Sequence, residues 1–482
     1  MSSQRLTSPG IVEPKGRAVG GTEHSWCRAV PGGTGIAVLA ILTTRFPRNS
    51  VLENALHKLQ KSHPILRSRL HTGSSSTNTI SFITSPTPFI KLKAFTLSST
   101  FEILENPSNP KNHPVSPLHL ILEHELNQNS WCNDNRAVPS SKNDVIQDMF
   151  FATIYALPNA KWVLVLRLHA SACDRTTAVS LLREMVALVS EEVRGAAPPP
   201  KEIADEGEVC LSIEDLVPNK KVKKGLWERG IDMLGYSVNS LRLTNLRFKD
   251  SRSPRSSQVV RLQMNQQDTE KIIAGCKSRG IKLCGALTSA GIIAAHKSKN
   301  RVDKQRKYAV VTLTDCRSLL EPSLSNHHFG FYHSAILNTH VMKGGEKLWE
   351  LAQKVYAAFA SYKNCNRHFS DMADLNFLMC KAIDNPGLTP SSSLRTALLS
   401  VFEESVTDNH AAMQKEVGVE DYMGCAAAHG IGPSIAIFDT IRDGRLDCVC
   451  VYPSPLHSRE QMQEFIDSMK SVLVEGCGGD VV

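Results

Sequence analysis

The chain has 482 residues, of which 41% are hydrophobic and 21% charged, and its formal net charge is +8. A chain of this length exceeds one ordinary domain, so two domains with separate cores are expected. The mild positive charge is spread along the chain and no nucleic-acid-binding motif is present. This argues against a nucleic-acid partner and weakly favours an anionic ligand.

The N-terminus and the cysteines predict a cytoplasmic protein. Residues 1–20 lack the apolar core of a secretory signal and are expected to form a disordered tail. No apolar run approaches the roughly 20 residues that span a bilayer, so no membrane span is expected. The 13 cysteines include no CxxC pair, and Cys448 and Cys450 share one face of a predicted strand. Free thiols in a reducing compartment are therefore predicted.

The first half of the chain alternates between strand and helix patterns. Ile36–Leu42 is an apolar run typical of a strand, and a capping box at Ser50 predicts the start of a helix that Pro64 bounds at its far end. Leu118–Glu123 and Phe150–Tyr155 are predicted to be further strands.

The most informative segment joins a core strand to a helix. Trp162–Leu168 is predicted to be a largely buried strand, and it ends at His169. Asp174 is a good N-cap for the amphipathic helix that follows, whose apolar stripe is Val179, Leu182, Val186, Val189 and Val193. A histidine held at such a strand end can face a cleft, where a general base would be placed. The alternative is a core histidine with its hydrogen bonds satisfied.

The middle of the chain is a proline-containing linker followed by a basic crossover. The crossover carries a run of four lysines, Lys220, Lys221, Lys223 and Lys224. Such a run is either a solvated loop or a surface that attracts the phosphates of an anionic ligand.

The second half repeats the alternation of strands and helices. Strands are predicted at Val259–Met264, Tyr308–Leu313, Phe331–Leu337, Ser434–Phe438 and Leu446–Tyr452, the last two forming a hairpin. Helices are predicted after Asp268, at Gly285–Ala295, and after a second capping box at Ser458. Both halves therefore predict an α/β fold class, of the two-layer α+β kind.

Four segments stand in a fixed order from Gly20 onward. They are Leu56–Leu70 with its His-Pro-Ile-Leu-Arg turn, the strand with His169 and Asp174, Asp315-Cys316-Arg317 followed by Phe329-Gly330, and Leu446–Phe465. In this order and spacing they resemble the condensation-domain and CoA-dependent acyltransferase superfamily. That superfamily includes peptide-synthetase condensation domains, the plant-type BAHD acyltransferases and the alcohol acetyltransferases.

The resemblance implies two chloramphenicol-acetyltransferase-like domains with a tunnel between them. Residues 21–195 would form the N-terminal domain, 196–257 the linker and crossover, and 258–482 the C-terminal domain. His169 would be the general base that removes a proton from a hydroxyl or amine acceptor as it attacks an acyl thioester. Acyl-CoA would be a co-substrate, with no bound cofactor and no metal, and the lysines at 220–224 would attract its phosphates or an acyl carrier protein. A monomer is expected, because both halves of the site come from one chain.

The chain departs from the superfamily pattern at its central motif. The superfamily spaces His and Asp by three residues, whereas Cys173 occupies that position here and Asp174 follows it. The superfamily's aspartate is a structural residue that pairs with an arginine of the second domain, for which Arg317 is the matching residue. Either a bulge lets Asp174 reach Arg317, or Asp174 is only an N-cap. The segment Ala428–Gly432 keeps only the two glycines of the BAHD motif Asp-Phe-Gly-Trp-Gly.

The sequence leaves three functions open. The first is acyl transfer from CoA with His169 as base, the second a non-catalytic binding or scaffold protein, and the third a carrier-protein-dependent enzyme that forms an amide. Cys173 is interpreted as a buried thiol rather than a nucleophile. His327, His328 and His333 lack the fixed spacing of metal ligands and are interpreted as turn and strand residues.

Overall fold

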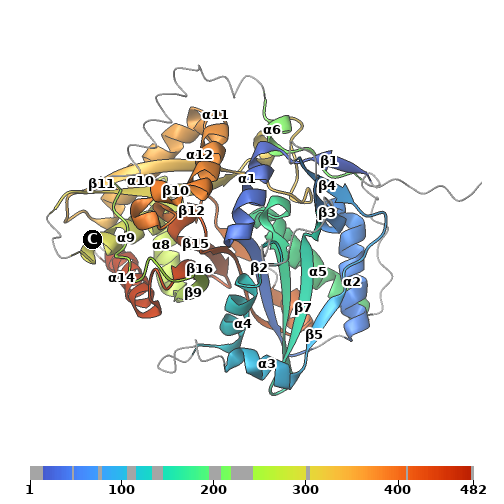
Figure 1. Ribbon diagram of the computed structural model, residues 1–482. Helices are drawn as coiled ribbons and strands as arrows, with labels where there is room; N and C mark the ends of the chain where they lie inside the picture. The colour runs from blue at the N-terminus through green and yellow to red at the C-terminus, as the bar shows by residue number, and fades with distance from the viewer. Residues whose placement is uncertain are drawn as a thin grey trace, which may run out of the picture.

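The structure is a computed structural model that describes residues 15–45, 48–73, 79–105, 115–132, 145–194, 208–218, 243–299, 304–408 and 411–478. Two halves lie side by side, the blue-to-green elements of the first half beside the yellow-to-red elements of the second (Figure 1). The lysines at 220, 221, 223 and 224 lie outside the described residues, so their proposed role stays a prediction. No helix among the described residues has the length and apolar character needed to cross a membrane.

The sheet of the first half has five strands. In spatial order they are β14 (Val419–Ala428), β2 (Thr34–Thr43), β8 (Lys161–His169), β7 (Phe150–Leu157) and β5 (Leu92–Phe95). One face packs against α2 (Asn49–Ser62) and α5 (Arg175–Arg194), and the other against α3 (Leu97–Leu104) and α4 (Pro117–Leu126). Side chains of β8 alternate between the two faces: Leu164, Leu166 and Leu168 belong to the first core and Val163 and Val165 to the second.

A smaller sheet flanks the first half. Its strands are β1 (Gly16–Ala18), β4 (Ile80–Thr84), β3 (Ser68–Thr72) and β6 (Val145–Asp148), and all neighbouring pairs are antiparallel. The helix α1 (Gly21–Ala29) follows β1 and packs against α12 (Met372–Asp384) of the second half.

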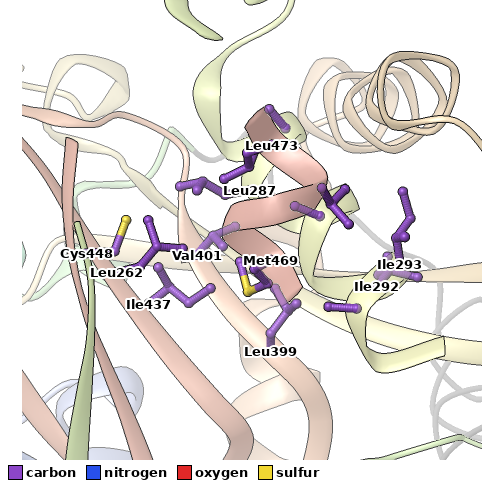
Figure 2. Close-up of a cluster of buried hydrophobic side chains, with 14 of the residues drawn as sticks. Leu262, Leu287, Ile292, Ile293, Leu399, Val401, Ile437, Cys448, Met469 and Leu473 are labelled. Atoms are coloured by element: carbon purple, nitrogen blue, oxygen red, sulfur yellow. The ribbon is translucent and has the colours of Figure 1, made fainter. Parts of the chain in front are cut away.

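The sheet of the second half has seven strands. Their order is β11 (His333–Met342), β10 (Arg306–Asp315), β12 (Arg395–Phe402), β15 (Gly432–Arg442), β16 (Arg445–Ser454) and β9 (Ser256–Gln263), with β13 (Val406–Asp408) pairing with β15. The helices α8 (Gln266–Ser278), α9 (Leu283–Lys297), α10 (Leu348–Asn364) and α14 (Arg459–Gly478) contribute to the core of this half. Figure 2 shows Leu287 of α9 and Met469 and Leu473 of α14 in one buried cluster with side chains of the sheet such as Leu399 and Ile437. The described residues also include three short α-helices: α6 (Ile213–Leu216), α11 (Arg367–Ser370) and α13 (Ala411–Glu416).

One strand crosses between the halves. β14 belongs by sequence to the second half, yet it pairs antiparallel with β2, from Val419 opposite Thr43 to Ala428 opposite Thr34. The predicted domain boundaries stay a prediction, but they do not separate the sheets, because residues after 258 complete the sheet of the first half.

Most predicted strands and helices are confirmed, with one strand wrong. Leu118–Glu123 lies in α4, a helix, and not in a strand. The Ser116 side chain accepts from His119 N at 3.3 Å, Pro117 occupies the first helical turn, and the buried Leu118, Ile121 and Leu122 share one helix face. A short apolar run fits both patterns, and here the N-cap and the packing of the helix against β2 favour the helix.

The predicted helix starts are partly wrong. The capping box at Ser50 does not form: α2 begins at Asn49 and has no side-chain cap. The helix α8 is capped by Asn265, which accepts from Asp268 N at 2.8 Å, so Asp268 lies in its first turn. At Ser458 half of the box forms, since Gln461 N donates to Ser458 Oγ at 3.2 Å. The side chain of Gln461 bonds instead to Arg247 O.

Candidate functional site

Asp174 receives hydrogen bonds from both halves of the chain. It follows a single 3-10 turn, Ala170–Ala172, and lies just before α5, where its Oδ1 accepts from Thr177 N at 2.8 Å. From the second half, Arg317 donates to both carboxylate oxygens, at 2.9 and 3.1 Å. Tyr332 N also donates to Oδ2, at 2.8 Å. Of the two alternatives that the sequence left open, Asp174 is therefore an N-cap that also pairs with Arg317.

The pair of Asp174 and Arg317 is buried and strongly coupled. Only 4% of Asp174 and 2% of Arg317 is exposed. Burial by itself raises the pKa of Asp174, but the charge of Arg317 and the close approach of the His333 ring outweigh it and hold that pKa well below its usual range. Arg317 also donates to Thr177 Oγ1 and His328 O, each at 3.1 Å, so its position is fixed from several sides.

His169 lies at the end of β8 with 1% of its surface exposed. Its Nδ1 accepts a hydrogen bond from Ser171 N at 3.2 Å and lies 2.7 Å from Ser171 Oγ, while Trp131 packs edge-on against its ring at 5.2 Å. Burial lowers its pKa to about 3, so the ring is neutral near pH 7. A backbone N–H can only donate, so Nδ1 is the acceptor and the proton of the neutral ring is on Nε2.

Two cavities meet between the halves. The first, of about 200 Å³, lies among β2, α5, β14 and β15, and the second, of about 490 Å³, lies among α1, β11 and α12. They share seven lining residues: Trp26, Thr34, Leu313, Phe331, His333, Ser400 and Pro433. Most of the residues around both cavities are apolar, as is typical of a site for an organic ligand.

The cavities reach the central motif at Ala170 and not at His169. Ala170, Cys173 and Asp174 line the first cavity, whereas His169 lines neither. Asp174 makes the arginine pair expected of the superfamily's aspartate, and the fourth residue before it is Ala170. Counted from Asp174, the histidine position of the His-x-x-x-Asp motif is thus occupied by alanine. The general-base role of His169 stays a prediction that this geometry does not favour.

His333 lies where the two cavities meet. It is the first residue of β11, 5% of its surface is exposed, and it lines both cavities. Its Nδ1 lies 3.0 Å from Asp174 Oδ2, without the alignment of a full hydrogen bond. The sequence did not single it out as a site residue, because Asp174 is distant along the chain. The only available signal was a histidine at the start of a core strand, close after Arg317.

The other two histidines of that segment have separate partners. His328 Nδ1 accepts from Ser325 N at 3.0 Å, and His327 Nδ1 lies 3.0 Å from Glu184. Among the described residues, no group of three or more His, Cys, Asp or Glu side chains is placed to hold a metal ion.

Cys173 and Arg175 also line the first cavity. Burial raises the pKa of the Cys173 thiol, so it stays protonated near pH 7 and is a poor nucleophile.

Arg175 is a cavity residue for which the sequence predicted no role. Its Nη1 donates to Asp439 Oδ1 at 3.1 Å and its guanidinium lies over the Phe402 ring at 4.3 Å, which joins α5 to the second half.

No protein-family model and no curated protein matches this chain. Solved structures do match over nearly all of it. The trichothecene 15-O-acetyltransferase TRI3 from Fusarium sporotrichioides has a TM-score of 0.69 at 10% identity, covering 98% of this chain and 97% of that one. The first condensation domain of the calcium-dependent antibiotic synthetase has a TM-score of 0.63 at 11% identity, covering 98% of each chain. The X-domain in a complex with OxyB from teicoplanin biosynthesis has a TM-score of 0.56 at 14% identity, covering 99% of this chain and 97% of that one.

These similarities confirm the predicted fold class. Over nearly its whole length the chain has the same mixed helix-and-sheet fold as the TRI3 acetyltransferase and the condensation domain. At such low identity the comparisons define the fold, and the reaction has to be argued from the site.

Proposed function

We propose that this chain transfers an acyl group from a thioester to a hydroxyl or amine acceptor. The observation that carries this proposal is the meeting of two apolar cavities at one imidazole, beside the buried pair of Asp174 and Arg317. One cavity would hold the acyl thioester and the other the acceptor, so the reacting atoms would meet at the junction. Holding both reactants in one enclosed site supplies the orientation that such a reaction needs. The fold shared with TRI3, named an acetyltransferase, supports this reading.

The thioester in this proposal is an acyl-CoA. The lysines at 220, 221, 223 and 224 remain the proposed attraction for its phosphates, since four clustered ammonium groups favour an anionic partner. The fold shared with a condensation domain of an antibiotic synthetase supports a second donor, an acyl group on a carrier protein supplied in trans. The protein is proposed to act as a cytoplasmic monomer.

The test of this proposal is thiol release from acyl thioesters. The wild-type protein is incubated with acyl-CoAs of increasing chain length, each with and without a panel of alcohols and amines. Release that requires both donor and acceptor supports the proposal. A matched variant, Ser400→Phe, places a bulky ring at the junction of the cavities and is expected to abolish release while the protein stays folded. Release that is unaffected by this variant would contradict the proposed site.

A second candidate function is a non-catalytic binding module. The observation that favours it is Ala170 at the cavity-lining position of the motif, with His169 turned out of both cavities. The fold shared with an X-domain seen in a complex with OxyB supports binding by this architecture. Saturable acyl-CoA binding by calorimetry, with no thiol release for any acceptor, would favour this function over acyl transfer.

A further inference from the structure

We propose that His333, and not His169, is the general base of this site. The inference rests on the proposed acyl transfer and names the residue that carries its proton transfer. A base has to touch the acceptor while the acceptor attacks the thioester. Of the two histidines, only His333 lines the cavities, and it lines both of them at their junction.

His169 and His333 differ in which ring nitrogen carries the proton, and this difference decides which of them can act as a base. In His169 the neighbouring Ser171 N–H occupies Nδ1, which puts the proton of the neutral ring on Nε2 and leaves no free lone pair. In His333 a carboxylate oxygen faces Nδ1 at 3.0 Å, so Nδ1 carries the proton. Nε2 of His333 is then the unprotonated nitrogen, and no hydrogen bond among the described residues occupies it. His333 can accept a proton, and His169 cannot without first changing tautomer.

Asp174 is placed to support a charged imidazole at His333. Its position is fixed by Arg317, Thr177 N and Tyr332 N, so its Oδ2 is held beside Nδ1. A carboxylate in that position orients the ring and stabilises the imidazolium that forms when the base takes up a proton. The imperfect alignment of Nδ1 and Oδ2 is usual in an unliganded site, where such contacts tighten when substrate binds.

Two aromatic side chains pack against the ring of His333. Phe402 packs edge-on at 5.8 Å between ring centroids, and Phe331 lies tilted at 6.4 Å. Both are cavity residues, so they restrict the ring to the junction. Together with Asp174 they position His333, which comes from the second half of the chain, at the junction of the two cavities.

The proposed step balances as follows. His333 Nε2 removes the proton of the acceptor O–H or N–H while that atom forms a bond to the thioester carbonyl carbon. The carbonyl π electrons move to oxygen, giving a tetrahedral intermediate. As the intermediate collapses, the carbon–sulfur bond breaks and the imidazolium returns the proton to sulfur. The products are the ester or amide and the free thiol.

The experiment compares three histidine-to-glutamine variants in the thiol-release assay, with the donor and acceptor that serve the wild type. His333→Gln is expected to lower kcat by about 100-fold or more with little change in KM, the usual loss for a missing general base. His169→Gln is expected to keep kcat within a few-fold, because Gln can still accept from Ser171 N. His340→Gln, on the same strand but lining neither cavity, is the matched control and is expected to leave kcat unchanged.

Rescue distinguishes a lost base from a damaged fold. Added imidazole is expected to restore part of the activity of His333→Ala and none to an equally slow variant whose defect is structural. Rescue of His333→Ala by imidazole therefore tests whether His333 is the base even where His333→Gln folds poorly.

The outcomes that overturn the inference differ from those that overturn the proposed function. If His169→Gln loses activity and His333→Gln keeps it, or if both keep it, His333 is not the base although acyl transfer stands. If the wild type releases no thiol with any pair, the proposed function fails and the inference fails with it.

Discussion

Asp174 is the residue through which the two halves of the chain meet at the site. Its two oxygens accept four hydrogen bonds, from Thr177 N, Tyr332 N and the two terminal nitrogens of Arg317. A buried carboxylate is tolerated only when it is paired and its lone pairs are satisfied. The same residue therefore caps α5, closes the interface between the halves and, in our proposal, orients His333.

Removal of Arg317 is expected to destabilise the fold strongly. Arg317→Ala leaves Asp174 as an uncompensated buried charge, which costs about 3–5 kcal/mol. The exposed pair of Arg28 and Asp384 provides the control, since Arg28→Ala should cost no more than about 1 kcal/mol. Midpoints of urea denaturation measure both. Equal shifts for the two variants would show that the buried pair contributes no more than a surface one.

The buried His169 predicts a loss of stability in acid. Its pKa in the folded state, about 3, is below the ordinary value of 6.5, so the unfolded chain binds the proton more tightly. The free energy of unfolding therefore falls as the pH drops from 6.5 towards 3, with a slope of up to about 1.4 kcal/mol per pH unit.

His169→Gln is expected to remove that contribution. Denaturation midpoints at pH 7 and pH 4.5 are compared between the variant and the wild type. Burial also lowers the pKa values of His429 and His457, so both proteins should weaken in acid, the variant less. An equal loss in the two proteins would mean that His169 is not the neutral, buried ring described above.

At the scale of elements, the turn between β14 and β15 determines how the second half reaches the first. Its residues His429 and Gly430 both donate their backbone N–H groups to Gly33 O, at 3.1 and 3.2 Å. A Cβ atom on Gly430 would lie 2.4 Å from Gly32 O and 2.8 Å from Thr34 Oγ1. Only glycine allows the two backbones to approach this closely.

Gly430→Ala is therefore expected to destabilise the protein by about 1–3 kcal/mol, the usual cost of overpacking. The contact is with backbone oxygen, which cannot rotate away. Gly387→Ala is the control, because no atom lies within 4 Å of its added Cβ. Thermal unfolding of both variants measures the difference, and a Gly430→Ala protein as stable as the control would show that the turn can shift freely.

Sequence patterns predicted the long buried strands correctly but not the helix Pro117–Leu126. The predicted strands Phe150–Tyr155 and Trp162–Leu168 lie within the observed strands Phe150–Leu157 and Lys161–His169, because apolar runs with β-branched and aromatic residues favour a buried strand. Leu118–Glu123 was predicted as a strand because the run is short and mostly apolar, whereas it lies in the helix Pro117–Leu126. Its helix depends on the Ser116 cap and on packing against β2, and the packing is not visible in the local pattern.

At the scale of the whole molecule, the halves are joined by a shared strand and by a buried ion pair. β14 completes the edge of the first sheet beside β2. Glu123 of α4 accepts from Arg459 of α14 at 2.7 and 2.9 Å, and Val259 N donates to the same carboxylate at 2.7 Å. We therefore expect each half to depend on the other for folding, while the predicted domain boundaries stay a prediction.

Separate expression of the halves tests this dependence. With the chain divided between Gly230 and Ile231, the N-terminal fragment lacks β14 and exposes the edge of β2, so we expect it to aggregate. Co-expression of the two fragments is expected to give a soluble complex, which copurification through a tag on one fragment would detect. A monomeric N-terminal fragment with a cooperative thermal transition would contradict the expectation.

The sequence by itself determined the class of fold, the strand-to-helix segment around His169 and the pairing candidates Asp174 and Arg317, because these depend on local periodicity and on a fixed order of motifs. Which ring faces the cavities was decided only by the tertiary structure. Side chains of a strand alternate between two faces, and a sequence shows the alternation without showing which face borders the ligand space. The contact between His333 and Asp174 arises where β11 of the second half meets the start of α5, and residues so distant along the chain come together only through the packing of the whole molecule.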